Sequence, residues 1–294
     1  MHYTGTIWRP PYEAYSLLIQ VTAGCTHHSC KFCTLYEDLP FKFKLSPFSE
    51  VEQDLAEASK YYHKVPRIFF TGANPFVLNT EKLKELAKMV KEYYPKYETI
   101  GCFARITDIT PKTVEELREL HALGYDGITI GVETGDDEML AFMNKGFQSK
   151  DTIEQCKKLE AANISYNFFY LTGISGAGRA EIGANETAKV FNQLHPRIIE
   201  SSMLTIYKNS ELYEEIQKGN WREESEIEKL IELKTLIENL KITTRIVTDG
   251  ASNLIQVRGN LPKDKEKLMK HLQYQISNAD ESVLREYRVN LRHL

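Results

Sequence analysis

Short apolar runs alternate with amphipathic stretches along the first two thirds of the chain. The apolar runs are rich in β-branched and aromatic residues and are continuous, which is typical of strands in a parallel sheet buried on both faces. They lie at 15–22, 67–71, 98–104, 127–132, 164–173 and 198–205. Stretches with the period of a helix follow them, among them 81–94 and 179–194. Six strand–helix units in a row predict a parallel α/β sheet, open or closed.

Local signals predict where two of the helices begin. Ser49 and Glu52 have the spacing of a capping box, so we expect a helix from there to about Tyr62. Thr110 followed by Pro111 predicts the start of a further helix, which Gly124 ends.

The pattern changes after residue 205. A long charged helix is expected at about 223–241, followed by two short strand-like pieces, TTRIVT and NLIQVRGNLP, and a helical region from Lys263. No repeat or clear linker separates these elements from the rest. We therefore expect a core domain at 1–210 and a helical and short-strand extension at 211–294 that packs on it.

Composition describes an ordinary globular protein. Of the 294 residues, 42% are hydrophobic and 27% charged, and the formal net charge is −4, so nothing indicates nucleic acid as a partner. No apolar run approaches eighteen residues, so no membrane association is expected. The start MHYTGTIWRPPYEAY does not resemble a signal peptide, and five cysteines, three of them clustered, do not resemble a disulfide framework. We expect a cytoplasmic protein.

The stretch AGCTHHSCKFC, residues 23–33, carries the candidate chemistry. Cys25, Cys30 and Cys33 follow the first predicted strand, and such a density of thiols in one loop argues against buried structural cysteines. One alternative is zinc with His27 or His28 as the fourth ligand, in a zinc-stabilised binding module without enzymatic activity. Structural zinc usually takes two separated ligand pairs, and a second Cys-x-x-Cys is absent here.

A 4Fe–4S cluster is the other interpretation, and the one we favour. Such a cluster normally takes four thiolates, so a set of three leaves one iron open to bind another molecule. Phe32, just before the third cysteine, would then shield the cluster or stack on a neighbouring adenine. Cys102 and Cys156 are separated in the sequence and predict no second cluster.

The loop and its place in the chain resemble the radical S-adenosylmethionine superfamily. The common spacing in that superfamily has three and then two residues between the cysteines, whereas this chain has four and then two. The segment GITIGVETGDDEMLAFMNKG (127–146) is similar to the fourth strand and following helix of the branch that includes oxygen-independent coproporphyrinogen oxidase and Elongator-type enzymes. The resemblance implies a partial (β/α)6 TIM-like barrel.

The resemblance also implies which residues bind S-adenosylmethionine. Gly72, Ala73 and Asn74 fall at the turn that presents backbone carbonyls to the amino group of the ligand. Glu133 falls at a strand end facing the ribose, and Lys145 falls where a basic residue faces the methionyl carboxylate. Gly173, in TGISGAG, falls in the glycine motif that packs along the adenine.

The implied activity is reductive cleavage of S-adenosylmethionine to a 5′-deoxyadenosyl radical, with an oxygen-sensitive cluster. The partners would be a one-electron reductant such as flavodoxin or ferredoxin and a substrate that the sequence does not identify. We expect residues 248–265 to shape the substrate end, where Asn253 and Arg258 are the polar groups that could hold a carboxylate or amide, although this segment could equally only extend the sheet.

Overall fold

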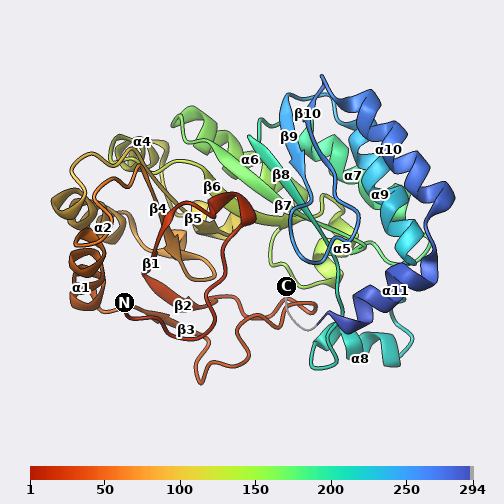
Figure 1. Cartoon of the computed structure of the whole chain (residues 1–294), viewed down its shortest axis with the longest axis horizontal. Helices are drawn as coiled ribbons and strands as arrows, with labels where there is room; N and C mark the ends of the chain where they lie inside the picture. Colours follow the sequence, from red (N-terminus) through yellow and green to blue (C-terminus); the bar gives the residue numbers. More distant parts are fainter. Residues whose placement is uncertain (292–294) are drawn as a thin grey trace. The chain divides into compact units, whose positions relative to one another are not determined.

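A computed structural model describes residues 1–291 and gives an α/β fold (Figure 1). The strands are β1 (Leu17–Gln20), β2 (Thr22–Gly24), β3 (Phe43–Leu45), β4 (Arg67–Thr71), β5 (Thr99–Ala104), β6 (Ile128–Glu133), β7 (Tyr166–Thr172), β8 (Ile198–Met203), β9 (Thr244–Val247) and β10 (Arg258–Leu261). The α-helices are α1 (Phe48–Ser59), α2 (Thr80–Tyr93), α3 (Ile106–Ile109), α4 (Val114–Ala122), α5 (Asp137–Phe142), α6 (Ser149–Ala161), α7 (Ala180–Phe191), α8 (Glu211–Gln217), α9 (Glu226–Asn239), α10 (Lys265–Asn278) and α11 (Glu281–Asn290). Two 3₁₀ turns, η1 (Pro11–Glu13) and η2 (Pro75–Val77), complete the described elements.

The sheet has the order β1-β4-β5-β6-β7-β8-β9-β10, and β2 pairs with β3 separately. The pairs β1–β4, β4–β5, β5–β6, β7–β8 and β8–β9 are parallel, and β10 runs antiparallel to β9 at the edge. The predicted fold class, an α/β protein of the partial TIM-like barrel type, is confirmed. No helix within residues 1–291 combines the length and the apolar character needed to cross a bilayer.

The chain forms two compact units. The first comprises Met1–His28, Leu35–Gly131 and Gln155–Tyr166; the second comprises Ser29–Thr34, Val132–Glu154 and the chain from Asn167 onward. The short segment Ser29–Thr34 of the cysteine loop therefore belongs to the second unit. The expected domain boundary at residue 210 does not coincide with a boundary of either unit, and the division into two domains there stays a prediction.

In the first unit, the continuous apolar runs bury one face of the sheet under helices. Side chains of a strand alternate between the two faces, and on this face they are fully buried: Ile68 and Phe70 of β4, and Ile100 and Cys102 of β5. Leu83, Leu86 and Val90 of α2 are also fully buried. On the opposite face, Arg67 donates to Glu13 (Nε–Oε2 2.8 Å) and to Thr99 Oγ1 (3.0 Å). The N-terminal segment thus covers that face of the first unit.

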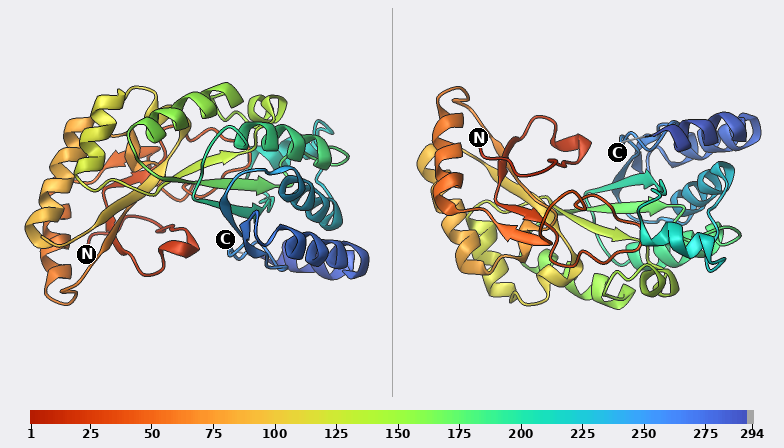
Figure 2. Two further views of the ribbon diagram at one scale, coloured as in Figure 1. Left: turned by 90° about the horizontal axis from the view of Figure 1, so that it is seen from above. Right: turned by 90° about the horizontal axis from the view of Figure 1, so that it is seen from below.

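In the second unit, β7 and β8 carry a layer of helices. Phe168 and Tyr170 of β7 pack against Phe191 of α7, with ring centroids 4.7 and 6.4 Å apart. Helix α9 packs against α7, α10 and α11 (Figure 2). Arg288 of α11 is buried and donates to the carboxylate of Glu226 on α9 (2.8 Å) and to the carbonyl of Ser252 (2.6 Å). The elements after residue 205 are therefore part of the packed core of this unit.

Two local predictions were wrong. Helix α1 begins at Phe48 after Pro47, with no side-chain cap, because the first turn starts one residue before Ser49. Helix α4 begins at Val114 and not at Pro111. Thr113 and Glu116 form a reciprocal capping box there, which stabilises a start three residues after the one that Thr110 and Pro111 predicted.

Candidate functional site

The three clustered cysteines have the donor chemistry of a metal site. Cys25 follows β2, and its amide donates to the Lys42 carbonyl (2.7 Å) at the end of the β2–β3 ribbon. None of the three forms a disulfide; Cys25 and Cys30 are half-buried and Cys33 is exposed. Within residues 1–291 no three His, Cys, Asp or Glu side chains are gathered into a metal-binding group. Three thiols, the donor type that iron–sulfur clusters take, thus stand in one loop.

The two other cysteines are buried. Burial raises the pKa of Cys102 and Cys156 well above the ordinary value, so both stay as thiols. They are part of the apolar core.

The turn after β4 holds the first part of the cysteine loop. Asn74 is fully buried, and its side-chain amide donates to Thr26 Oγ1 (2.7 Å) and to Asp108 Oδ1 (3.1 Å). Its side-chain oxygen accepts from the Thr26 amide (3.3 Å). The side chain of Asn74 therefore fixes the residue that follows Cys25.

The backbone at Gly72 requires glycine. Its φ is +128°, and a Cβ at this position would lie 2.0 Å from Thr22 Oγ1. The sequence predicted Gly72–Asn74 as a ligand-binding turn. At this turn the sequence did not indicate Asp108. Its burial raises its pKa to about 6, and its carboxylate also accepts a hydrogen bond from the Arg105 amide (2.7 Å).

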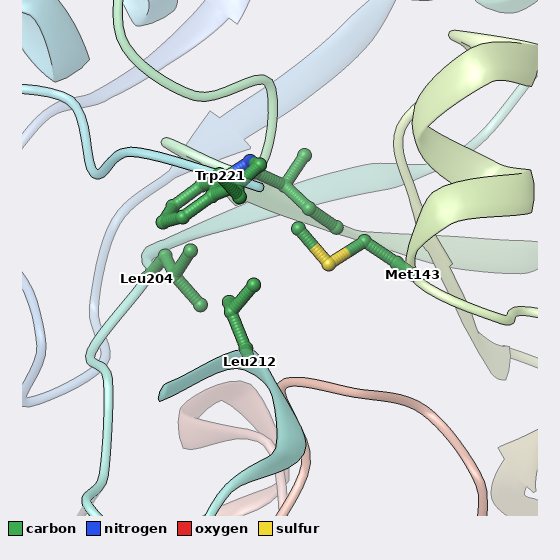
Figure 3. Packing of buried hydrophobic residues seen from close by; sticks show 5 residues of the cluster. Met143, Leu204, Leu212 and Trp221 are labelled. Atoms are coloured by element: carbon green, nitrogen blue, oxygen red, sulfur yellow. The ribbon is translucent and has the colours of Figure 1, made fainter. Parts of the chain in front are cut away.

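The second part of the cysteine loop is fixed within the second unit. The Lys31 amide donates to the Met143 carbonyl (3.2 Å), and the Lys31 carbonyl accepts from the Leu212 amide (2.7 Å). Phe32 packs against a buried apolar cluster made of Met143, Ile174, Leu204, Leu212 and Trp221. Figure 3 shows the side chains of Met143, Leu204, Leu212 and Trp221 of this cluster pointing toward one another. Phe32 is thus an anchor for the loop, whether or not it also contacts an adenine.

Glu133 and Lys145 are brought together, as a shared site requires. Glu133 ends β6 with a left-handed φ of +68°, which is uncommon for a residue with a side chain. Its Oε1 lies 3.2 Å from Lys145 Nζ, and Lys145 is only 4% exposed. The ammonium group also lies 5.7 Å from the ring centres of Phe32 and Phe147. Backbone strain at an ion pair with one buried partner, here Lys145, is typical of functional positions.

Gly173 packs closely against α9. Its φ is +95°, and a Cβ there would lie 3.0–3.3 Å from the carbon stem of Lys229. Its amide donates to Glu232 of α9 (2.6 Å). The motif that begins with Gly173 therefore contacts α9, and the expected contact with adenine stays a prediction.

Asn253 and Arg258 lie in the second unit, where the Asn253 amide nitrogen and the Arg258 guanidinium donate to groups of the protein, whereas Asn253 Oδ1 is buried without a hydrogen-bond partner. Asn253 is 4% exposed and donates to the Ser201 carbonyl (2.9 Å), whereas Arg258 is exposed and donates to Asp249. No sequence pattern singled out Glu200 of β8. Its carboxylate accepts from the amides of Asp249 (2.9 Å) and Gly250 (3.2 Å), and burial raises its pKa to about 7.

Comparisons with known proteins match the resemblance. The profile of the Radical SAM superfamily matches residues 19–184. A tRNA uridine(34) acetyltransferase of Methanocaldococcus infernus is 22% identical over 275 residues, which cover 79% of this chain and 51% of the relative. The heme chaperone HemW of Bacillus subtilis is 23% identical over 152 residues, which cover 49% of this chain and 39% of the relative.

Among solved structures, coproporphyrinogen III oxidase (HemN) of Escherichia coli superimposes with a TM-score of 0.53 at 16% identity, covering 76% of this chain and 51% of that one. The predicted family and branch are confirmed. The chain spans about half of these relatives or less, so their similarity describes a shared part.

Proposed function

Because the chain belongs to the radical S-adenosylmethionine superfamily, we propose that it cleaves S-adenosylmethionine reductively and directs the resulting radical at a bound substrate. The family profile spans the cysteine loop, Glu133, Lys145 and Gly173, and this single observation carries the proposal. The cofactors of this family are a 4Fe–4S cluster and S-adenosylmethionine.

Cys25, Cys30 and Cys33 would hold the cluster. Their thiols are outside any disulfide and lie in a loop whose two ends are fixed by Asn74 and by the Lys31 backbone. When bound by these thiols, the cluster would supply the one electron needed for reductive cleavage of S-adenosylmethionine to methionine and a 5′-deoxyadenosyl radical. Anchored loop ends reduce the ordering entropy that ligation costs, which favours this donor set.

Glu133 and Lys145 would orient S-adenosylmethionine. Lys145 offers a buried positive charge to the methionyl carboxylate, and Glu133 offers hydrogen-bond acceptors to the ribose hydroxyls. The backbone carbonyls of Gly72, Ala73 and Asn74 would bind the amino group, that of Asn74 beside the hydrogen bond it already accepts from the Val77 amide (3.0 Å). Such binding would position the sulfonium for cleavage and exclude water from it.

The partners follow from the chemistry. A one-electron donor such as flavodoxin or ferredoxin would reduce the cluster, and three thiols outside any disulfide fit a reducing, cytoplasmic environment. Residues 1–210 would supply the cofactor-binding barrel and residues 211–294 the cover of its substrate end. Although similar proteins are named for tRNA acetylation and heme, these names concern proteins of which the chain spans about half or less.

Anaerobic reconstitution tests the proposal. We expect a brown protein with about four irons and four sulfides per chain, a reduced-cluster signal in electron paramagnetic resonance, and formation of 5′-deoxyadenosine with dithionite. Cys30→Ala should lose the cluster and the product, whereas Cys156→Ala should retain both. Stoichiometric zinc in protein purified anaerobically from iron-replete cells would favour the zinc-stabilised binding module instead.

A further inference from the structure

Lys31, between the second and third cysteines, is fixed through its backbone on both sides. Its amide donates to the Met143 carbonyl just after α5, and its carbonyl accepts from the Leu212 amide in the first turn of α8. Next to it, the Ser29 carbonyl accepts from the Asn144 side chain (2.9 Å). These hydrogen bonds tie the backbone of this short segment to α8 and to the end of α5.

The side chain of Lys31 is held by the same two helices. Its ammonium group lies 3.5 Å from Glu215 and 3.6 Å from Glu211, both on α8. It also lies 4.6 Å from the ring centre of Phe142, the last residue of α5. The side chain is 19% exposed, so the charge is partly withdrawn from solvent and weakly screened.

Helix α8 lies beyond the part of the chain that the family profile describes. The profile ends at residue 184, and α8 spans Glu211–Gln217. Leu212 contributes its amide to Lys31 and its side chain to the apolar cluster that holds Phe32 (Figure 3). The hydrogen bond and ion pairs that fix Lys31 to α8 therefore involve residues outside that profile.

We propose that Lys31 is a positioning residue for the iron–sulfur cluster, and that α8 fixes both its backbone and its charge so as to set the reduction potential of the cluster. The inference rests on the proposed function, because it needs a cluster on Cys30 and Cys33. Reduction adds an electron, so a positive charge on the residue between two of the ligands favours the reduced state, and the carboxylates of Glu211 and Glu215, 3.6 and 3.5 Å from the ammonium, moderate this effect. Outer groups of this kind tune both potential and retention of a metal.

Two charge changes of opposite sign test the proposal. In reconstituted protein, Lys31→Met should lower the midpoint potential of the cluster, measured by a titration followed by electron paramagnetic resonance. The double variant Glu211→Gln, Glu215→Gln should raise it, since it leaves the lysine charge unopposed. The amide oxygen that replaces the carboxylate at position 215 can still accept the hydrogen bond from Asn220. Lys31→Arg should stay near the wild type.

Glu214→Gln is the matched control for the acidic positions. Glu214 lies on the same helix but pairs with Lys218 and is 67% exposed, so its replacement should leave the midpoint potential unchanged. Glu211→Gln alone covers the case in which the double variant does not fold, since Glu211 is 53% exposed. It should shift the potential in the same direction as the double variant and by less.

Cluster retention provides a second readout. Lys31→Met should release iron to a chelator about tenfold faster than the wild type, the size of effect typical of lost outer-shell contacts. Shifts of the same sign in both charge variants, or no shift in either, would overturn the proposal. If the wild type itself held no cluster, the proposed function would fail before this inference was reached.

Discussion

At the scale of single residues, the Glu133–Lys145 pair is where the expected site is most fully assembled. Lys145 is buried, and its ammonium lies against Glu133 and near two aromatic rings. Such a pair suits a ligand that brings a carboxylate and hydroxyl groups at once, because each protein charge then gains a partner.

Glu133→Gln and Lys145→Met should therefore weaken S-adenosylmethionine binding. Each loses a hydrogen bond to a charged group, worth about 1.5–3 kcal/mol, or roughly tenfold to a hundredfold in affinity. Equilibrium dialysis with the reconstituted protein measures this, and the cluster spectrum without ligand should not change. Lys150→Met, at an exposed position of α6, is the control. Wild-type affinity in both variants would mean that the ligand binds elsewhere.

At the scale of elements, the sequence predicted most strands and helices well. The run 67–71 is strand β4 without any shift, because a continuous apolar run between a polar loop and a turn has few alternatives. The run 15–22 divides into β1 and β2, since pairing with β4 ends where the Val21 amide donates to the Thr71 carbonyl (3.3 Å), and the chain then pairs with β3. The place where one strand ends and the next begins depends on which strands they pair with, and a local sequence pattern does not contain this information.

The candidate site was predictable only in part. The cysteines, Glu133 and Lys145 stand in motifs that can be recognised locally. Asp108 and Leu212 could not be selected, because they act on the cysteine loop through Asn74 and through a backbone hydrogen bond from a distant helix. Contacts of this kind depend on tertiary packing and have no signature in a window of sequence.

Helix α9 and the segment before it carry buried acids that should make stability depend on pH. Glu224 and Glu232 are buried close together, and burial together with their mutual repulsion raises the pKa of Glu224 far above 4.5; burial raises the pKa of Glu232 as well. The folded state therefore binds protons that the unfolded state has released. The stabilisation is fully present below pH 4.5 and is lost as pH rises through the raised values.

The free energy of unfolding, measured in urea, should accordingly fall from weakly acidic to alkaline pH. Glu224→Gln keeps a neutral side chain at every pH and should flatten this decline. Glu214→Gln, at an exposed position, should keep the wild-type slope. A Glu224→Gln protein with an unchanged slope would show that other groups are responsible.

At the scale of the whole molecule, the C-terminal helices are part of the fold that carries Lys145 and the Cys30–Cys33 segment. Arg288 is 3% exposed and joins α11 to Glu226 of α9 and to the backbone at Met203 and Ser252. Removal of the Arg288 guanidinium leaves the buried carboxylate of Glu226 and the carbonyls of Met203 and Ser252 without this donor.

Arg288→Met should thus lower the free energy of unfolding by about 3 kcal/mol. Arg285, on the same helix, also pairs with Glu226 but is 43% exposed, so Arg285→Met should cost no more than about 1 kcal/mol. Urea unfolding of both variants at neutral pH compares them. Equal losses of unfolding free energy in the two variants would indicate that the burial of Arg288 does not increase its contribution to stability.

The left-handed backbone at Glu133 has a consequence for how this position can evolve. The backbone there favours glycine or asparagine, whereas the proposed contact with the ribose requires a carboxylate. Selection for folding alone and selection for activity should therefore enrich different residues at position 133. In a library randomised at this codon, glycine and asparagine would survive a screen for expression, and only a screen for turnover would return glutamate.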